Sequence, residues 1–167
     1  KGLFGLIGSK NAKVRASIKK TPGDRTKDFV TELLRYMNIE AAVDVNEISE
    51  RIDVNLSGRG MGLLIGHRGE TLDALQYLIS LVVNKEGDEY KRINLDTENY
   101  RQKREETLRR LARRLSYKVS KTKRKITLEP MNPFERRIIH STLQNNNYVR
   151  TYSEGDEPYR RVVIICK

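Results

Sequence analysis

Polar and apolar residues alternate along two stretches in the first half of the chain, at the period of two that marks a half-buried strand. We expect strands there, over residues 42–48 and 51–56. Before them, apolar residues recur at helical spacing and predict a helix over 25–38. The apolar positions of that helix are Phe29, Val30, Leu33, Leu34 and Met37.

A glycine-rich segment over 58–69 follows the strands and contains a short apolar turn at 62–65. Leu, Ile and Val then recur with the helical period and predict a helix over 70–84. Residues 91–95 read as another strand. The order helix, strand, strand, short helix, glycine loop, long helix, strand predicts a compact α+β unit over 25–96.

The rest of the chain predicts a second α+β unit, over 97–167. Its first segment, 97–125, is densely charged, but its apolar residues keep helical spacing, so we expect a packed helix there. A later helix has a strong start signal, because Asn132 suits the cap and Pro133 the first turn. The expected elements after the charged helix are a strand over 125–128, a helix over 133–143, and strands over 148–152 and 160–166.

The chain carries 33 basic and 22 acidic residues, a net charge of +11, which predicts a polyanion or an anionic surface as partner. Residues 97–125 hold twelve Lys or Arg and three Glu, most of this surplus. Arginines in i, i+4 rows on that helix would steer a polyanion with salt-sensitive affinity. The alternative is a solvated helix face. The four arginines are Arg109, Arg110, Arg113 and Arg114.

Several functional classes are disfavoured by composition. No run approaches the roughly eighteen apolar residues of a membrane span. One cysteine, Cys166, and two histidines, His67 and His140, are too few ligands for a structural zinc site. We therefore expect a cytoplasmic protein that does not span a membrane, with no metal and no cofactor.

The Gly66-His67-Arg68-Gly69 loop lies between a short helix and a long one. Glycines let a sugar-phosphate backbone approach the main chain, and the start of the following helix favours anionic oxygens. A Rossmann fingerprint and a P-loop both fail on glycine spacing. The remaining alternative is that the glycines only shape a tight turn between the helices.

The string I-G-H-R-G-E-T-L-D-A-L-Q over 65–76 resembles the core of a KH domain, and the element order resembles the type II arrangement, αββααβ. KH loops clamp about four backbone nucleotides of single-stranded RNA or DNA. The resemblance implies a backbone clamp made of Gly66, His67, Arg68 and Gly69. It implies a base groove near Leu63, Leu64 and Ile65.

Arg136 and His140 lie four residues apart, so on a helix they project from nearly the same side. Together they would make a phosphate cradle, with Arg137 beside them. The alternative is a solvated arginine and a structural histidine. The opposite side, with Phe134, Ile138 and Thr142, is expected to pack on the sheet.

The Arg-x-x-x-His spacing resembles the signature of the R-three-H domain, a small sheet packed by helices that binds single-stranded nucleic acid. A KH domain followed by an R-three-H domain closely resembles the bacterial Jag family, also called KhpB or EloR, over 25–167. Residues 1–24 then look like the tail of a truncated N-terminal domain plus a linker. The family resemblance also implies a small KH-domain partner protein and a link to cell-envelope growth, cell elongation or membrane-protein insertion.

We therefore expect a single-stranded RNA-binding protein, with single-stranded DNA as a further ligand, that acts as a post-transcriptional regulator and not as an enzyme. The alternative is a protein-assembly adaptor whose KH surface mainly contacts a partner KH protein or the membrane-insertion machinery. A nuclease is disfavoured, because neither histidine has a carboxylate cluster near it in sequence. Tyr148, Arg150 and Tyr152 share one strand face, which either stacks on bases or covers a helix.

Overall fold

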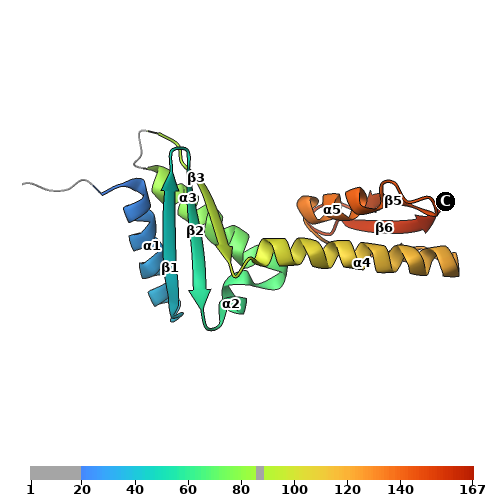
Figure 1. Ribbon diagram of the computed structural model, residues 1–167, viewed down its shortest axis with the longest axis horizontal. Helices are drawn as coiled ribbons and strands as arrows, with labels where there is room; N and C mark the ends of the chain where they lie inside the picture. The colour runs from blue at the N-terminus through green and yellow to red at the C-terminus, as the bar shows by residue number, and fades with distance from the viewer. Residues whose placement is uncertain (1–19, 86–88) are drawn as a thin grey trace, which may run out of the picture.

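The computed structural model describes residues 20–85 and 89–167, and it forms two units joined by one long helix (Figure 1). Residues 1–19 of the tail predicted over 1–24 lie outside the described residues. The N-terminal unit contains α1 (Pro22–Tyr36), β1 (Ala41–Ile48), β2 (Arg51–Gly58), α2 (Met61–Ile65), the 3-10 turn η1 (His67–Gly69), α3 (Glu70–Lys85) and β3 (Arg92–Thr97). The C-terminal unit contains α4 (Tyr100–Thr122), β4 (Ile126–Thr127), α5 (Pro133–Leu143), β5 (Val149–Glu154) and β6 (Arg161–Cys166).

The N-terminal unit is a three-stranded sheet in the order β1-β2-β3, with β1 antiparallel and β3 parallel to β2. The alternating residues Ile52, Val54 and Leu56 are almost completely buried, as the period of two predicts. They join one apolar cluster with residues of α1 and α3. The α+β class and the element order are confirmed.

The helix starts follow from local capping. The predicted start of α1 at residue 25 is late, because Thr21 and Asp24 form a capping box and Pro22 occupies the first turn. At α5 the Asn132 side chain accepts a hydrogen bond from the Glu135 amide at 2.8 Å, as the sequence predicts for a capping asparagine.

The C-terminal unit is a sheet in the order β4-β6-β5, packed by α4 and α5. The charged helix α4 is a packed helix, because Leu108, Ala112 and Val119 form a buried line along it. The prediction that Phe134 packs on the sheet is wrong, since this side chain is 63% exposed. The buried face of α5 is centred on Glu135, Ile139 and Leu143. Phe134 lies one residue before this row, which rotates it by about 100° around the helix and away from the core.

The first turn of α4 ties the two units together. Tyr100 packs against the apolar cluster of the N-terminal unit. The Arg101 guanidinium lies 2.8 Å from the Asp73 carboxylate and donates a hydrogen bond to the Gln76 side chain at 3.2 Å. A continuous helix with a bonded first turn therefore fixes the orientation of the second unit.

Candidate functional site

The glycine loop between α2 and α3 requires glycine at its first position. Gly66 has φ +69° and ψ −163°, a region that residues with a Cβ rarely adopt. A Cβ at this position would lie 2.7 Å from the Thr71 Cβ and would overlap the Thr71 Oγ1. The following turn also contains a left-handed residue, Arg68, with φ 57°. The loop therefore has a fixed, strained backbone at the start of α3.

Only part of the predicted clamp and of the predicted base groove faces outward. Leu63 is 71% exposed, and the His67 imidazole is exposed with its Nδ1 3.6 Å from a Glu70 carboxylate oxygen. Ile65 is half-buried beside them. The placement of Leu64 at a base groove is wrong, because this side chain is completely buried in the core, on the inner side of the short helix α2.

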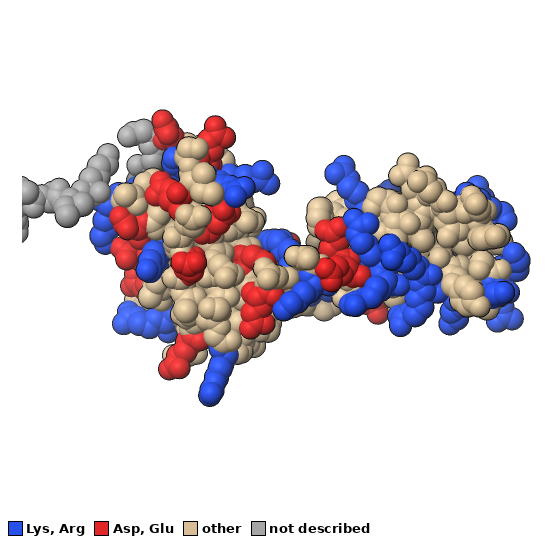
Figure 2. All heavy atoms as spheres, viewed as in Figure 1, with Lys and Arg blue, Asp and Glu red and all other residues tan. Residues whose placement is uncertain are grey.

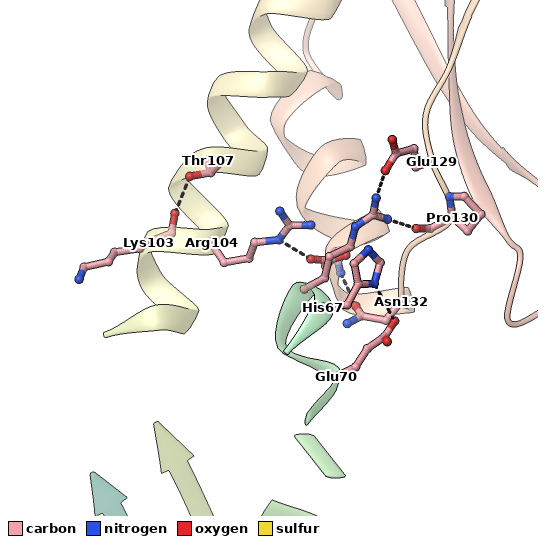
Figure 3. A network of polar contacts seen from close by, with 10 residues as sticks. His67, Glu70, Lys103, Arg104, Thr107, Glu129, Pro130 and Asn132 are labelled. Atoms are coloured by element: carbon pink, nitrogen blue, oxygen red, sulfur yellow. Dashed lines mark hydrogen bonds and ion pairs between the residues drawn. The ribbon is translucent and has the colours of Figure 1, made fainter. Parts of the chain in front are cut away.

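Arg68 points toward the C-terminal unit and not into solvent. Its guanidinium pairs with the Glu129 carboxylate and donates a hydrogen bond to the Pro130 carbonyl oxygen. Figure 3 shows Glu129 and Pro130 close to His67, where the segment that leads into α5 meets the loop. The charge of Arg68 is thus neutralised inside the chain. Sequence reasoning missed Glu129, because nothing local relates residues that are about 60 positions apart.

Gly69, the second glycine of the predicted clamp, is also part of the junction. It is buried, and a Cβ there would lie 2.8 Å from the Tyr100 ring. This glycine permits close packing of α4 against the loop. Its role in the structure is therefore a close approach between the two units.

Arg136 and His140 lie on the same side of α5, as predicted, but both are bonded within the chain. The Arg136 guanidinium pairs with Glu157 and donates a hydrogen bond to the Met131 carbonyl oxygen at 3.3 Å. The His140 ring nitrogens lie 2.7 Å from the Thr151 hydroxyl and 2.8 Å from the Ser153 hydroxyl. The pair therefore braces α5 against β5 and the segment between β5 and β6.

Burial lowers the pKa of His140 below its ordinary value of 6.5, and the nearby positive charge of Arg136 lowers that pKa further. Between the lowered pKa and 6.5 the unfolded chain binds more protons than the folded one. We therefore expect the free energy of unfolding to fall as the pH drops below 6.5. Above that pH this contribution is complete and constant.

Chemical denaturation at a series of pH values measures this effect, and the His140→Gln variant is its control. Glutamine keeps hydrogen-bonding capacity toward both hydroxyls but does not titrate. The variant should lose the part of the pH dependence that the wild type shows below 6.5. An unchanged pH dependence would contradict the assignment to His140.

A groove of about 470 Å³ runs between α5 and the edge strand β5. Three cationic side chains line it, Arg137, Arg150 and Lys167, and all three are exposed. None of its lining residues is Asp or Glu. Its other lining residues are His140, Ser141, Leu143, Gln144, Val149 and Thr151. The groove is therefore a cationic surface that includes His140 of the Arg–His pair.

The cavity between the glycine loop and α5 has the opposite character. Its volume is about 520 Å³, and its lining includes four carboxylate residues besides His67 and Arg68. Three of these carboxylates are paired with Arg68, Arg104 and Arg136, so the cavity has no surplus of positive charge for a phosphate. The four residues are Glu70, Glu129, Glu135 and Glu157.

The predicted basic face of α4 is present. Arg110, Arg113 and Arg114 are exposed, whereas Arg109 is half-buried and pairs with Glu105 at 2.7 Å. Figure 2 shows Lys and Arg side chains gathered over α4, while the N-terminal unit carries both signs of charge interspersed. This face provides a long-range attraction for polyanions.

Within residues 20–85 and 89–167, no three His, Cys, Asp or Glu side chains cluster in a way that would hold a metal ion. In the same part of the chain, no helix combines the length and the apolar character that crossing a membrane requires.

Comparison with known proteins places both units in described families. A model of the KH domain of KhpA/KhpB matches residues 27–95, and a model of the R-three-H domain matches residues 106–165. The RNA-binding protein KhpB of Clostridium symbiosum is 53% identical over 163 residues, which cover 96% of this chain and 73% of that protein. The RNA-binding protein KhpB of Bacillus subtilis (strain 168) is 40% identical over 169 residues, which cover 100% of this chain and 81% of that protein. With both domains matched in this order and such identity along nearly its whole length, the chain belongs to the KhpB family.

Proposed function

We propose that this chain binds single-stranded RNA through the sugar-phosphate backbone and does not cleave it. The observation that carries this proposal is the groove between α5 and β5, which combines three cations with no carboxylate in its lining. The names of the KhpB relatives, both described as RNA-binding, agree with it. Single-stranded DNA offers the same phosphates and is a second ligand of this surface.

The KH loop supplies a second, weaker contact. Gly66 and the exposed His67 offer a close approach for the backbone, and Leu63 offers apolar surface for a base. The positive charge of Arg68 does not contribute to RNA binding while Arg68 is paired with the Glu129 carboxylate. Two weak sites on one rigid body gain affinity when one strand reaches both.

The double variant Arg137→Ala and Arg150→Ala tests the proposal. We expect the affinity for a single-stranded RNA to fall about ten-fold, because both cations contact phosphates. The plot of log affinity against log salt should become less steep by roughly 1.4, since each of the two lost contacts on a single strand contributes about 0.7. Fluorescence anisotropy at several salt concentrations measures both quantities.

The matched control is the double variant Arg35→Ala and Arg92→Ala, which removes the same charge from exposed positions on α1 and β3. It should leave the affinity nearly unchanged. Equal losses in both double variants would mean that only the net charge matters, and the groove would not be a binding site. A duplex of the same length should bind much more weakly than the single strand.

We further propose a role as a post-transcriptional regulator linked to cell-envelope growth or elongation. This role rests on the family resemblance. Crosslinking the protein to RNA in cells and sequencing the attached RNA tests it.

A second candidate function, as an assembly adaptor, is favoured by one surface. The outer side of α3 exposes an apolar stripe whose members are between 44% and 65% exposed, and such stripes are typical of protein contacts. A small KH-domain protein is the proposed partner. The ultraviolet absorbance ratio of the purified protein, with or without bound nucleic acid, separates the two functions. The stripe consists of Tyr77, Leu78, Leu81 and Val82.

A further inference from the structure

The sheet of the C-terminal unit has one covered face. Both α4 and α5 contact this sheet and each other. The apolar cluster that joins them to the strands contains Val149, Val162 and Ile164, but not the intervening Val163. Successive side chains of a strand point to opposite faces. Both helices therefore pack on the face that carries Val162 and Ile164.

The opposite face has no helix of the described residues packed on it. Strand pairing places Tyr152 opposite Val163, and Thr127 on the far side of Val163, in one row. The next row pairs Arg150 with Ile165. Val163 is completely buried while Tyr152 is 41% exposed. The side chains of this face therefore form an apolar layer with an accessible aromatic ring at its edge.

The surroundings of this ring are cationic. Arg150 is exposed and lies on the same face as Tyr152, about 7 Å along the strand. Glu154, the one carboxylate among the described strand residues of this face, lies directly opposite Arg161. Tyr148, just before β5, is 68% exposed and follows the same alternation. Aromatic rings flanking an arginine suit bases attached to a polyanion better than they suit a neutral or cationic partner.

We propose that this open sheet face is a base-stacking platform for single-stranded nucleic acid, with Tyr152 as its principal ring and Tyr148 as the second. Arg150 belongs both to this face and to the groove between α5 and β5. A strand whose phosphates lie in the groove therefore passes over the edge strand β5, with its bases turned onto the platform. This inference rests on the proposed function and assigns the bases to a surface separate from the KH loop.

The Tyr152→Leu variant tests the platform. Leucine keeps Val163 covered by an apolar side chain, so the fold is preserved, but it removes the aromatic face. We expect the affinity for single-stranded RNA to fall about five-fold or more, in line with the loss of one base–aromatic stack. The salt dependence should not change, because no phosphate contact is lost. Tyr152→Phe should retain the wild-type affinity.

Two comparisons make the outcome decisive. The control Tyr36→Leu removes a ring that is 70% exposed on α1 and should have no effect. A strand of the same length without bases should bind the wild type and Tyr152→Leu equally. If Tyr152→Leu binds RNA as the wild type does while Arg137→Ala with Arg150→Ala is impaired, the platform is refuted and the groove stands. If the double variant Arg137→Ala with Arg150→Ala also binds RNA with the wild-type affinity, the proposed function itself fails.

Discussion

Replacing Gly66 by alanine is expected to lower the free energy of unfolding by about 3 kcal/mol. The backbone angles of Gly66 cost a residue with a Cβ about 1–3 kcal/mol. The added Cβ must also displace Thr71, whose Oγ1 it would overlap. Chemical denaturation measures the loss. Substitutions at Gly66 therefore report on folding before they report on binding.

Gly62→Ala is the matched control, four residues earlier in the same segment. Gly62 lies within α2, and nothing lies within 4 Å of a Cβ built there. Alanine stabilises helix interiors relative to glycine by roughly 0.5–1 kcal/mol, so this variant should be neutral or slightly more stable. Equal destabilisation of the two variants would show that Gly66 has no special backbone requirement.

Replacing Glu135 by glutamine is expected to cost about 2 kcal/mol of stability. The Glu135 side chain is buried, and one of its carboxylate oxygens accepts a hydrogen bond from the Arg104 Nε at 2.7 Å. Hydrogen bonds to charged groups contribute about 1.5–3 kcal/mol. The lower part of this range applies, because the Arg104 side chain is 26% exposed and water screens part of the pair. In Figure 3, a dashed line from the Arg104 guanidinium marks this contact between α4 and α5.

Glu105→Gln is the control for Glu135→Gln. Glu105 also pairs with an arginine at 2.7 Å, Arg109, but both side chains are more than a third exposed and lie on the same helix. Exposed i, i+4 pairs contribute about 0.3–0.5 kcal/mol. Chemical denaturation should therefore separate the two variants clearly. A loss for Glu135→Gln no larger than for Glu105→Gln would mean that burial of the α4–α5 pair adds no stability.

The sequence alone predicts most of the elements that the structure describes in residues 20–85 and 89–167. The period of two in β2, the helical period in α4 and the capping residues of α5 are local properties, because each depends on neighbours within one or two turns. The same is true of the glycine loop, of the helices on either side of it and of the Arg–His spacing on α5, since each is visible in a short stretch of sequence. They are sufficient to predict two α+β units and the family of each.

Only the tertiary structure decided which charges remain available to a ligand. Arg68 and Arg136 read as binding residues in the sequence, but Glu129 and Glu157 neutralise them in the folded chain. Arg150, which sequence analysis placed only on a strand face, lines the cationic groove. The physical reason is that an ion pair depends on distance in space, and burial and screening set its strength. No local pattern encodes contacts between side chains that are far apart in the chain.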